Sequence, residues 1–261
     1  MQEFERHLSQ GRDALENGDF AAAVTSFRSA AAIDPASPQI HALLGEALAE
    51  VGHPKEALAS LQKALELVPD HVDTLYVLGD LYFETGELDL AFKTYQQILE
   101  LDSRESDALV SMGLIHFTRE QIDQAVSCYH NALEIEPDSP FALNSLGDAL
   151  YARGENDEAL ASYRRVLALD PEDPQAHFNL AEMYYDTGDL DSAEAECRET
   201  VRLDSGFAFA HLTLGNIYLD RERPREALHS FQEFLLRERS VDSREIREEV
   251  AAVVAGLKAE L

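Results

Sequence analysis

The sequence repeats itself with a period of 34 residues. Aligned on this period, one place holds a small residue in every copy, and a place twelve residues later holds alanine without exception. The small residues are Gly11, Gly45, Gly79, Gly113, Gly147, Ala181 and Gly215, and the alanines are Ala23, Ala57, Ala91, Ala125, Ala159, Ala193 and Ala227. A period of this length is typical of stacked supersecondary units, because one unit cannot bury its own apolar face. We therefore expect the 261 residues to form an open array of repeats.

Each period contains signals for two helices joined by a turn. Apolar residues recur at helical spacing on both sides of the turn, as at Leu75, Leu78 and Tyr82 before it and at Tyr95 and Ile98 after it. Glycine, which adopts left-handed conformations readily, marks the turn at Gly18, Gly52, Gly86, Gly154 and Gly188. Proline, which cannot continue a helix, follows the second helix at Pro35, Pro69, Pro137 and Pro171. The pattern predicts one helix pair per period.

Counted from residue 4, the repeat has a small residue at place 8, alanine at place 20, a large side chain at place 24 and proline at place 32. The large side chains are Phe27, Leu61, Tyr95, Tyr129, Tyr163 and Phe231. This pattern resembles the tetratricopeptide repeat. The resemblance implies an all-α fold, a right-handed superhelical α-solenoid of antiparallel helix pairs. Residues 4–241 are expected to form seven repeats, at 4–37, 38–71, 72–105, 106–139, 140–173, 174–207 and 208–241.

The last segment, residues 242–261, predicts a C-terminal capping helix. Its expected apolar stripe consists of Ile246, Val250, Val253 and Leu257. The first helix of the array is already polar on its outer side, so residues 1–261 are expected to form a complete array.

A few residues depart from the repeat pattern. Glu120 and Glu222 stand at the turn place, where the other copies have glycine. In the sixth repeat, Cys197 and Thr200 occupy places that usually hold larger packing residues. We expect this repeat to be the loosest.

The charge balance excludes several classes of partner. The chain has 50 acidic and 21 basic residues and a formal net charge of −29, which repels nucleic acids and anionic lipids. No stretch has the apolar length of a membrane span, and the N-terminus lacks the pattern of a signal peptide. The two cysteines, Cys128 and Cys197, are too few for a disulfide framework. These observations predict a cytoplasmic protein that binds no nucleic acid and does not insert into membranes.

Motifs for catalysis, metal binding or cofactor binding are missing from the sequence. Histidine recurs at place 4, as His7, His41, His177 and His211, but equivalent places lie too far apart to share one metal ion. The segment 186–194 lacks the glycine and glutamate of a calcium loop. We therefore expect a protein that is not an enzyme and has no catalytic residue, metal or cofactor.

The resemblance implies that the first helix of each pair lines the concave wall of the array, with places 2, 5, 9, 12 and 13 facing it. The predicted peptide-binding groove has aromatic and apolar residues at Tyr76, Phe83, Val110, Phe117, Tyr151, Phe178 and Tyr185. Its predicted carboxylates are Asp80, Glu84, Asp148, Glu182 and Asp186. Tyrosine is also common at these places in the family, so a shared consensus remains the alternative explanation of the aromatic residues.

An aromatic floor with acidic walls suits a protein or peptide segment with Lys or Arg beside apolar residues. Family members that bind chaperone C-terminal carboxylates use lysines at the wall places, and this sequence has none there. The leading hypothesis is a monomeric adaptor that binds a partner in its groove. One alternative is a self-assembling structural scaffold in which a segment of one copy enters the groove of the next. Another is a targeting arm of an enzyme complex.

Overall fold

The computed structural model describes residues 2–240 and 243–261, and within these residues it contains fifteen helices and no strand. Fourteen helices form consecutive pairs. These are α1 (Gln2–Glu16) and α2 (Phe20–Ile33), α3 (Pro38–Glu50) and α4 (Pro54–Leu67), α5 (Val72–Glu84) and α6 (Leu88–Leu101), α7 (Ser106–Thr118) and α8 (Ile122–Ile135), α9 (Pro140–Arg153) and α10 (Asn156–Leu169), α11 (Pro174–Asp186) and α12 (Leu190–Leu203), and α13 (Ala208–Asp220) and α14 (Pro224–Arg237). The last helix is α15 (Arg244–Glu260). Seven helix pairs followed by one helix confirm the predicted fold class and repeat number.

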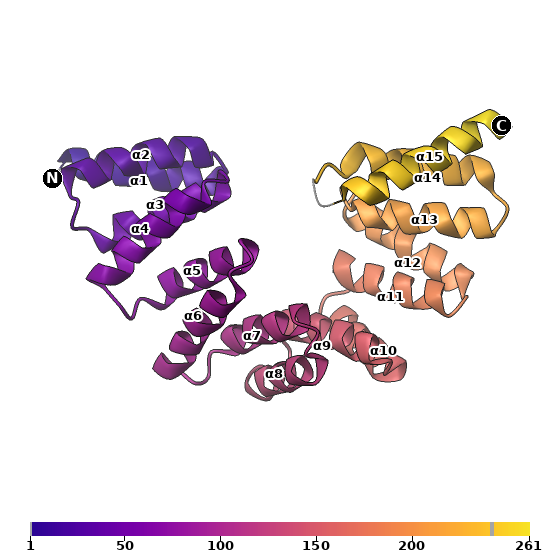
Figure 1. The fold of residues 1–261 in the computed structure, drawn as a ribbon, viewed down its shortest axis with the longest axis horizontal. Helices are drawn as coiled ribbons and strands as arrows, with labels where there is room; N and C mark the ends of the chain where they lie inside the picture. Colours follow the sequence, from indigo (N-terminus) through magenta and orange to yellow (C-terminus); the bar gives the residue numbers. More distant parts are fainter. Residues whose placement is uncertain (1, 241–242) are drawn as a thin grey trace. The chain divides into compact units, whose positions relative to one another are not determined.

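The chain divides into two compact units, Met1–Ile135 and Glu136–Leu261. In the first unit, each pair packs internally, and the second helix of one pair packs on the first helix of the next, as α2 does on α3 and α4 on α5 (Figure 1). The second unit is built in the same way, and α15 packs on α14. Each unit is thus a stack of antiparallel helix pairs. The predicted boundary at residues 241 and 242 lies outside the described residues.

Side-chain caps and prolines determine where several first helices begin. The Ser139 hydroxyl accepts a hydrogen bond from the Ala142 N–H at 3.3 Å, and the Asp173 carboxylate accepts one from the Ala176 N–H at 2.7 Å. In both cases the next residue is proline at the first helical position, where no backbone donor is needed. These local signals place the start of these two repeats independently of packing.

A close contact between the small residue at place 8 and the large side chain at place 24 joins the two helices of each pair. A Cβ atom added to Gly11 would lie 2.3 Å from the ring of Phe27, and one added to Gly147 would lie 2.4 Å from the ring of Tyr163. The side chains at place 24 are completely or almost completely buried. Glycine is therefore required at place 8 wherever a ring or leucine stands at place 24.

The sixth repeat satisfies the same constraint with different residues. Ala181 replaces the glycine and Cys197 replaces the ring, and both are completely buried, as is Thr200. A larger residue on one helix faces a smaller one on the other, so the space between α11 and α12 is filled. The burial of all three side chains does not support the expected looseness of this repeat.

The C-terminal helix buries a slightly different stripe from the predicted one. Val250, Val254 and Leu257 are buried in one cluster with Phe231 and Phe234 of α14. Val253, which was predicted to belong to the stripe, is 39% exposed. The helical period of 3.6 residues turns position 254, not 253, toward α14.

The two turn glutamates adopt the backbone conformation of the glycines that they replace. Glu120 and Glu222 have φ angles of 59° and 56°, while the turn glycines have φ angles between 71° and 85°. A residue with a Cβ atom is strained in this region by about 1–2 kcal/mol. The fold imposes the left-handed turn even where the sequence does not favour it.

We expect Glu120→Gly and Glu222→Gly each to raise the free energy of unfolding by about 0.5–1 kcal/mol, because relief of strain outweighs the greater chain entropy of glycine. Urea unfolding followed by circular dichroism measures this change. Gly86→Ala is the matched control, since φ is 78° and a Cβ atom there would meet nothing within 4 Å. The control should lose stability, and an unchanged or less stable glutamate-to-glycine variant would contradict the prediction.

Candidate functional site

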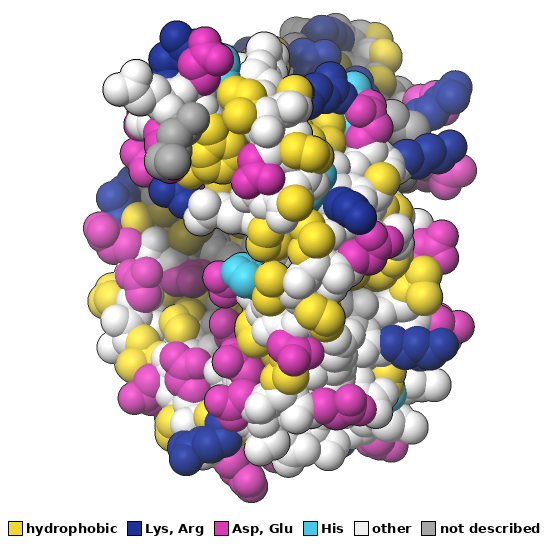
Figure 2. Space-filling model, turned by 90° about the vertical axis from the view of Figure 1, so that its left-hand side faces the viewer, with side chains coloured by type: hydrophobic (Ala, Val, Ile, Leu, Met, Phe, Trp, Pro, Cys, Tyr) yellow, Lys and Arg dark blue, Asp and Glu magenta, His cyan; other side chains and the backbone are white. Residues whose placement is uncertain are grey.

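The predicted groove residues lie on first helices in both units. In the first unit, α5 provides Tyr76, Asp80, Phe83 and Glu84, and α7 provides Val110 and Phe117; in the second, α9 provides Asp148 and Tyr151, and α11 provides Phe178, Glu182, Tyr185 and Asp186. The six aromatic side chains are half-buried, and all the carboxylates except the half-buried Glu182 are exposed. On one face of the molecule, acidic side chains are spread among hydrophobic ones (Figure 2).

Val110 does not belong to this surface, and its assignment to the groove was wrong. The side chain is completely buried, with 0% exposure. At the same place of other repeats, the longer side chains of Tyr76 and Phe178 reach the surface, whereas the short valine remains beneath it.

Three of the six aromatic residues contact the first helix of the next pair or the residue that caps it. The Tyr76 hydroxyl donates to Glu105 Oε2 at 3.1 Å, and the Tyr185 hydroxyl donates to Asp220 Oδ2 at 3.0 Å. Burial and these carboxylates raise the pKa of both tyrosines. The Phe178 ring lies 4.8 Å from the ring of Phe207, measured between centroids. These rings stabilise the stack and expose only part of their area.

The carboxylates at place 9 also contact the interior. Asp80 Oδ1 accepts from the Tyr95 hydroxyl at 2.5 Å, and Asp148 Oδ1 accepts from the Tyr163 hydroxyl at 2.7 Å. Although both aspartates are exposed in part, the surrounding protein removes some of the water around their carboxylates, and this desolvation raises the pKa of both. The tyrosine hydrogen bond opposes this effect. Glu182 accepts a hydrogen bond from the Thr213 hydroxyl at 2.7 Å. These carboxylates are structural acceptors as well as part of the acidic surface.

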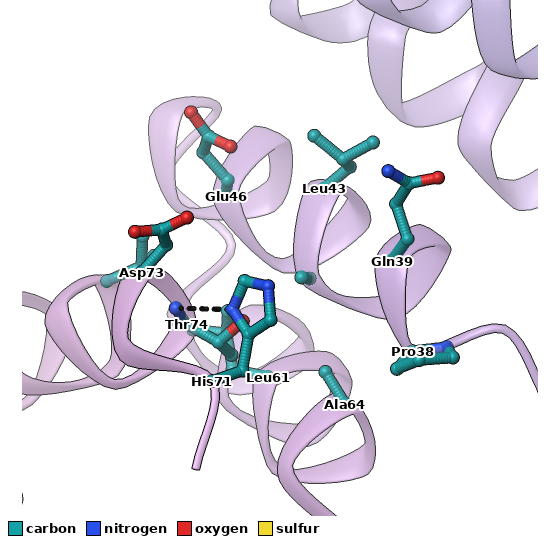
Figure 3. Close-up of a pocket in the computed structure, with 11 residues that line it drawn as sticks. Pro38, Gln39, Leu43, Glu46, Leu61, Ala64, His71, Asp73 and Thr74 are labelled. Carbon is teal, nitrogen blue, oxygen red and sulfur yellow. Dashed lines mark hydrogen bonds between the residues drawn. The ribbon is translucent and has the colours of Figure 1, made fainter. Parts of the chain in front are cut away.

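An apolar pocket of about 310 Å³ lies on the first unit among α3, α4 and α5 (Figure 3). Its apolar lining consists of Pro38, Ala42, Leu43, Leu61, Ala64 and Val77, and its polar lining consists of Gln39, Glu46, His71, Asp73 and Thr74. His71 Nδ1 accepts a hydrogen bond from the Thr74 N–H at 3.3 Å, which fixes the imidazole at the start of α5. The pocket thus combines an apolar interior with two carboxylates.

The pocket lies where the second repeat has smaller side chains than the third repeat. Places 5, 24 and 27 hold Ala42, Leu61 and Ala64, whereas the third repeat has Tyr76, Tyr95 and Ile98 at those places. The missing volume is left open between the helices. The pocket was not predicted from the sequence, although alanine at place 5, Ala42, was a visible signal.

An acidic recess of about 300 Å³ adjoins this pocket and shares Glu46 and Val77 with it. The recess is lined by Glu46, Ala49, Glu50, Val77, Asp80, Leu81 and Glu84, which include four carboxylates and no basic side chain. Burial and the neighbouring Glu50 raise the pKa of Glu46. Asp80 and Glu84 were predicted groove residues, while Glu46 was missed. The arrangement favours a cation beside an apolar group.

Within residues 2–240 and 243–261, no group of three or more histidine, cysteine or acidic side chains is placed to hold a metal ion. No described helix is both long and apolar enough to cross a membrane. Cys128 and Cys197 are free thiols.

Comparison with family models matches most of the chain to one repeat type. Models described as TPR repeat match residues 11–52, 113–152 and 147–188, and models described as tetratricopeptide repeat match residues 37–104 and 174–207. No curated protein matches the chain at a significant level.

Solved structures show the same fold at low sequence identity. A tetratricopeptide repeat protein from Parabacteroides merdae ATCC 43184 is 23% identical with a TM-score of 0.79, and the match covers 98% of this chain and 100% of that one. Pseudomonas aeruginosa PilF is 21% identical with a TM-score of 0.64, covering 78% and 93% of the two chains. The APC/C hetero-tetramer Cut9–Hcn1 contains a chain that is 15% identical with a TM-score of 0.72, covering 94% of this chain and 55% of that one.

The contact between Asp148 and Tyr163 predicts opposite outcomes for two substitutions. Asp148→Ala leaves the Tyr163 hydroxyl without its acceptor, and we expect a loss of about 1–3 kcal/mol in the free energy of unfolding. Asp148→Asn keeps an acceptor oxygen and removes a charge that burial disfavours, so we expect a loss below about 0.5 kcal/mol or a gain. Urea unfolding at neutral pH compares the two variants, with Glu84→Ala as an exposed control. Equal losses in both variants would show that the charge, not the hydrogen bond, is what stabilises the fold.

Proposed function

Because the chain belongs to the tetratricopeptide repeat family, we propose that it is a scaffold that binds a basic, partly apolar segment of another protein on the surface of its first helices. Proteins of this family are generally protein-binding scaffolds and usually not catalytic. The observation that supports the finer proposal most strongly is the apolar pocket beside the acidic recess on α3 and α5.

The pocket suits a single aliphatic side chain. Its interior is formed by Ala42, Leu43, Leu61 and Val77, and burial of a leucine or methionine there contributes about 1.5–3 kcal/mol. The pocket is open to solvent in the free protein, so an apolar side chain displaces water from it without any change in the helices.

The acidic recess suits a lysine or arginine of the same segment. Its four carboxylates repel one another, and a cation at Glu46 and Glu50 relieves this repulsion. Since Glu46 and Val77 line both spaces, the basic and the apolar side chain must be close together in the partner. The net charge of −29 speeds the approach of such a segment.

We propose that the remaining predicted residues make further contacts with the partner within each unit. In the first unit these are Tyr76, Asp80, Phe83, Glu84 and Phe117; in the second they are Asp148, Tyr151, Phe178, Glu182, Tyr185 and Asp186. The half-buried rings offer partial apolar area, and the exposed carboxylates keep the surface acidic.

We propose that the scaffold is a monomeric adaptor that catalyses no reaction and binds no cofactor. The free thiols Cys128 and Cys197 are consistent with a reducing compartment and so with the cytoplasm. The alternative is self-assembly, in which a segment of one copy is bound by the next. An apparent molecular mass, measured by light scattering, that increases with protein concentration would favour this alternative.

Binding of short labelled peptides, measured by fluorescence anisotropy, tests the proposal. A peptide that combines leucine with lysine should bind, and matched peptides with aspartate for lysine or serine for leucine should not. Ala42→Trp fills the pocket, and Glu84→Lys reverses a charge of the recess, so each should weaken binding at least about tenfold.

Two control substitutions make the same chemical changes on second helices. Ala59→Trp on α4 and Glu134→Lys on α8 both lie at exposed positions, and both should bind the leucine–lysine peptide normally. Equal binding by Ala42→Trp, Glu84→Lys and the two controls would exclude the α3–α5 surface as the site.

A further inference from the structure

A second pocket, of about 360 Å³, lies in the second unit and is lined by residues of α12, α13 and α14. It is lined by Arg198, His211, Leu214, Tyr218, Arg225, Glu226, His229 and Ser230. None of these residues belongs to the first-helix surface described above. Two arginines and two histidines line this pocket, in contrast to the acidic recess of the first unit.

His211 lacks the hydrogen bond that equivalent histidines make. His41 Nε2 donates to the Pro35 carbonyl at 2.9 Å, and His177 Nε2 donates to the Pro171 carbonyl at 3.1 Å. The equivalent carbonyl for His211 belongs to Ser205, six residues earlier in the chain.

Arg237 has taken over this carbonyl. Its Nε donates to the Ser205 oxygen, so the imidazole of His211 has lost its usual acceptor. His211 is only 7% exposed, and its Nε2 is buried with no hydrogen-bond partner among the described residues. A buried polar atom without a partner costs about 1–3 kcal/mol, which marks a position where a ligand has something to gain.

A cluster of ion pairs lies beside the pocket, and one carboxylate of this cluster, Glu226, lines the pocket itself. Glu194 is buried, and Arg198, Arg221 and Arg223 lie 2.7, 3.0 and 3.2 Å from its carboxylate oxygens. One carboxylate therefore faces three guanidinium groups, although Arg221 also pairs with Asp191 and Arg223 with Glu226.

Arg225 and His229 of α14 also line the pocket. Both are exposed, and no ion pair is found for either of them among the described residues. They are the groups of the pocket that are free to meet an incoming anion.

We propose that this pocket binds an acidic side chain, glutamate or aspartate, of a second protein segment. The carboxylate would meet Arg225, His229 and the unpaired imidazole of His211, while the aliphatic part of the side chain would pack on Leu214 and Tyr218. Arg198 remains paired with Glu194 and closes the opposite side. The proposed site for an acidic segment lies on α12, α13 and α14 of the second unit and shares no residue with the proposed site for a basic segment.

Peptide binding to the full chain tests this proposal. A labelled peptide with a central glutamate among small apolar residues should bind, and the same peptide with glutamine should bind at least about tenfold more weakly. Arg225→Gln and His229→Gln should each weaken binding of the glutamate peptide. Arg104→Gln, which removes an exposed arginine in the first unit, should not.

His211→Leu separates a binding role from a structural one. This variant removes an unpaired buried nitrogen, so it should keep or raise the midpoint of urea unfolding while it weakens binding of the glutamate peptide. The leucine–lysine peptide should not compete with the glutamate peptide, whether or not the first-helix site proves correct.

Three results would overturn the proposal. The first is equal affinity for the glutamate and glutamine peptides, and the second is normal binding by Arg225→Gln and His229→Gln. The third is displacement of the glutamate peptide by inorganic phosphate at concentrations where acetate has no effect, which would identify a phosphate site instead.

Discussion

The contact between a small residue at place 8 and a large side chain at place 24 is the interaction on which the other features depend. A Cβ atom added to any of the six glycines at place 8 would lie within 2.7 Å of the facing side chain. The two helices of a pair therefore approach as closely as their backbones and one ring permit. That distance determines which neighbouring side chains are buried, which reach the surface and where space is left.

The two proposed binding surfaces follow from local changes in this packing. In two of the three repeats that have tyrosine at place 24, at Tyr95 and Tyr163, the hydroxyl donates a hydrogen bond to a carboxylate at place 9, which thereby becomes part of the fold. Where place 24 is Leu61, with Ala42 and Ala64 beside it, the volume of a ring is missing and a pocket opens. The proposed site for a basic segment is thus a position where the repeat is incompletely filled.

The repetition of the sequence was enough to predict the helix pairs, the turns and the large buried side chains, because these depend on residues close together in one repeat. The errors concern depth and side-chain length. Val110 was assigned to the surface although it is completely buried, and Val253 was assigned to the stripe that Val254 occupies. A periodic pattern gives the direction of a side chain but not how far its neighbours extend above it.

Features that depend on several repeats at once could not be predicted in this way. Ala42 of α3 and Leu61 and Ala64 of α4 line a pocket together with Val77 of α5. The unpaired nitrogen of His211 results from Arg237, which lies one helix later and takes the carbonyl that other histidines use. Both features depend on contacts between helices, which residue type and spacing alone do not reveal.

A double-mutant cycle in the sixth repeat tests the packing rule most directly, because this repeat satisfies the rule with Ala181 and Cys197. Cys197→Phe alone should lose about 1–3 kcal/mol in the free energy of unfolding, since the ring would meet the Cβ atom of Ala181. Ala181→Gly in the same protein should restore most of that loss and recreate the pair seen at Gly215 and Phe231, which corresponds to a coupling energy of at least about 1 kcal/mol. Losses that simply add in the double variant would contradict the account.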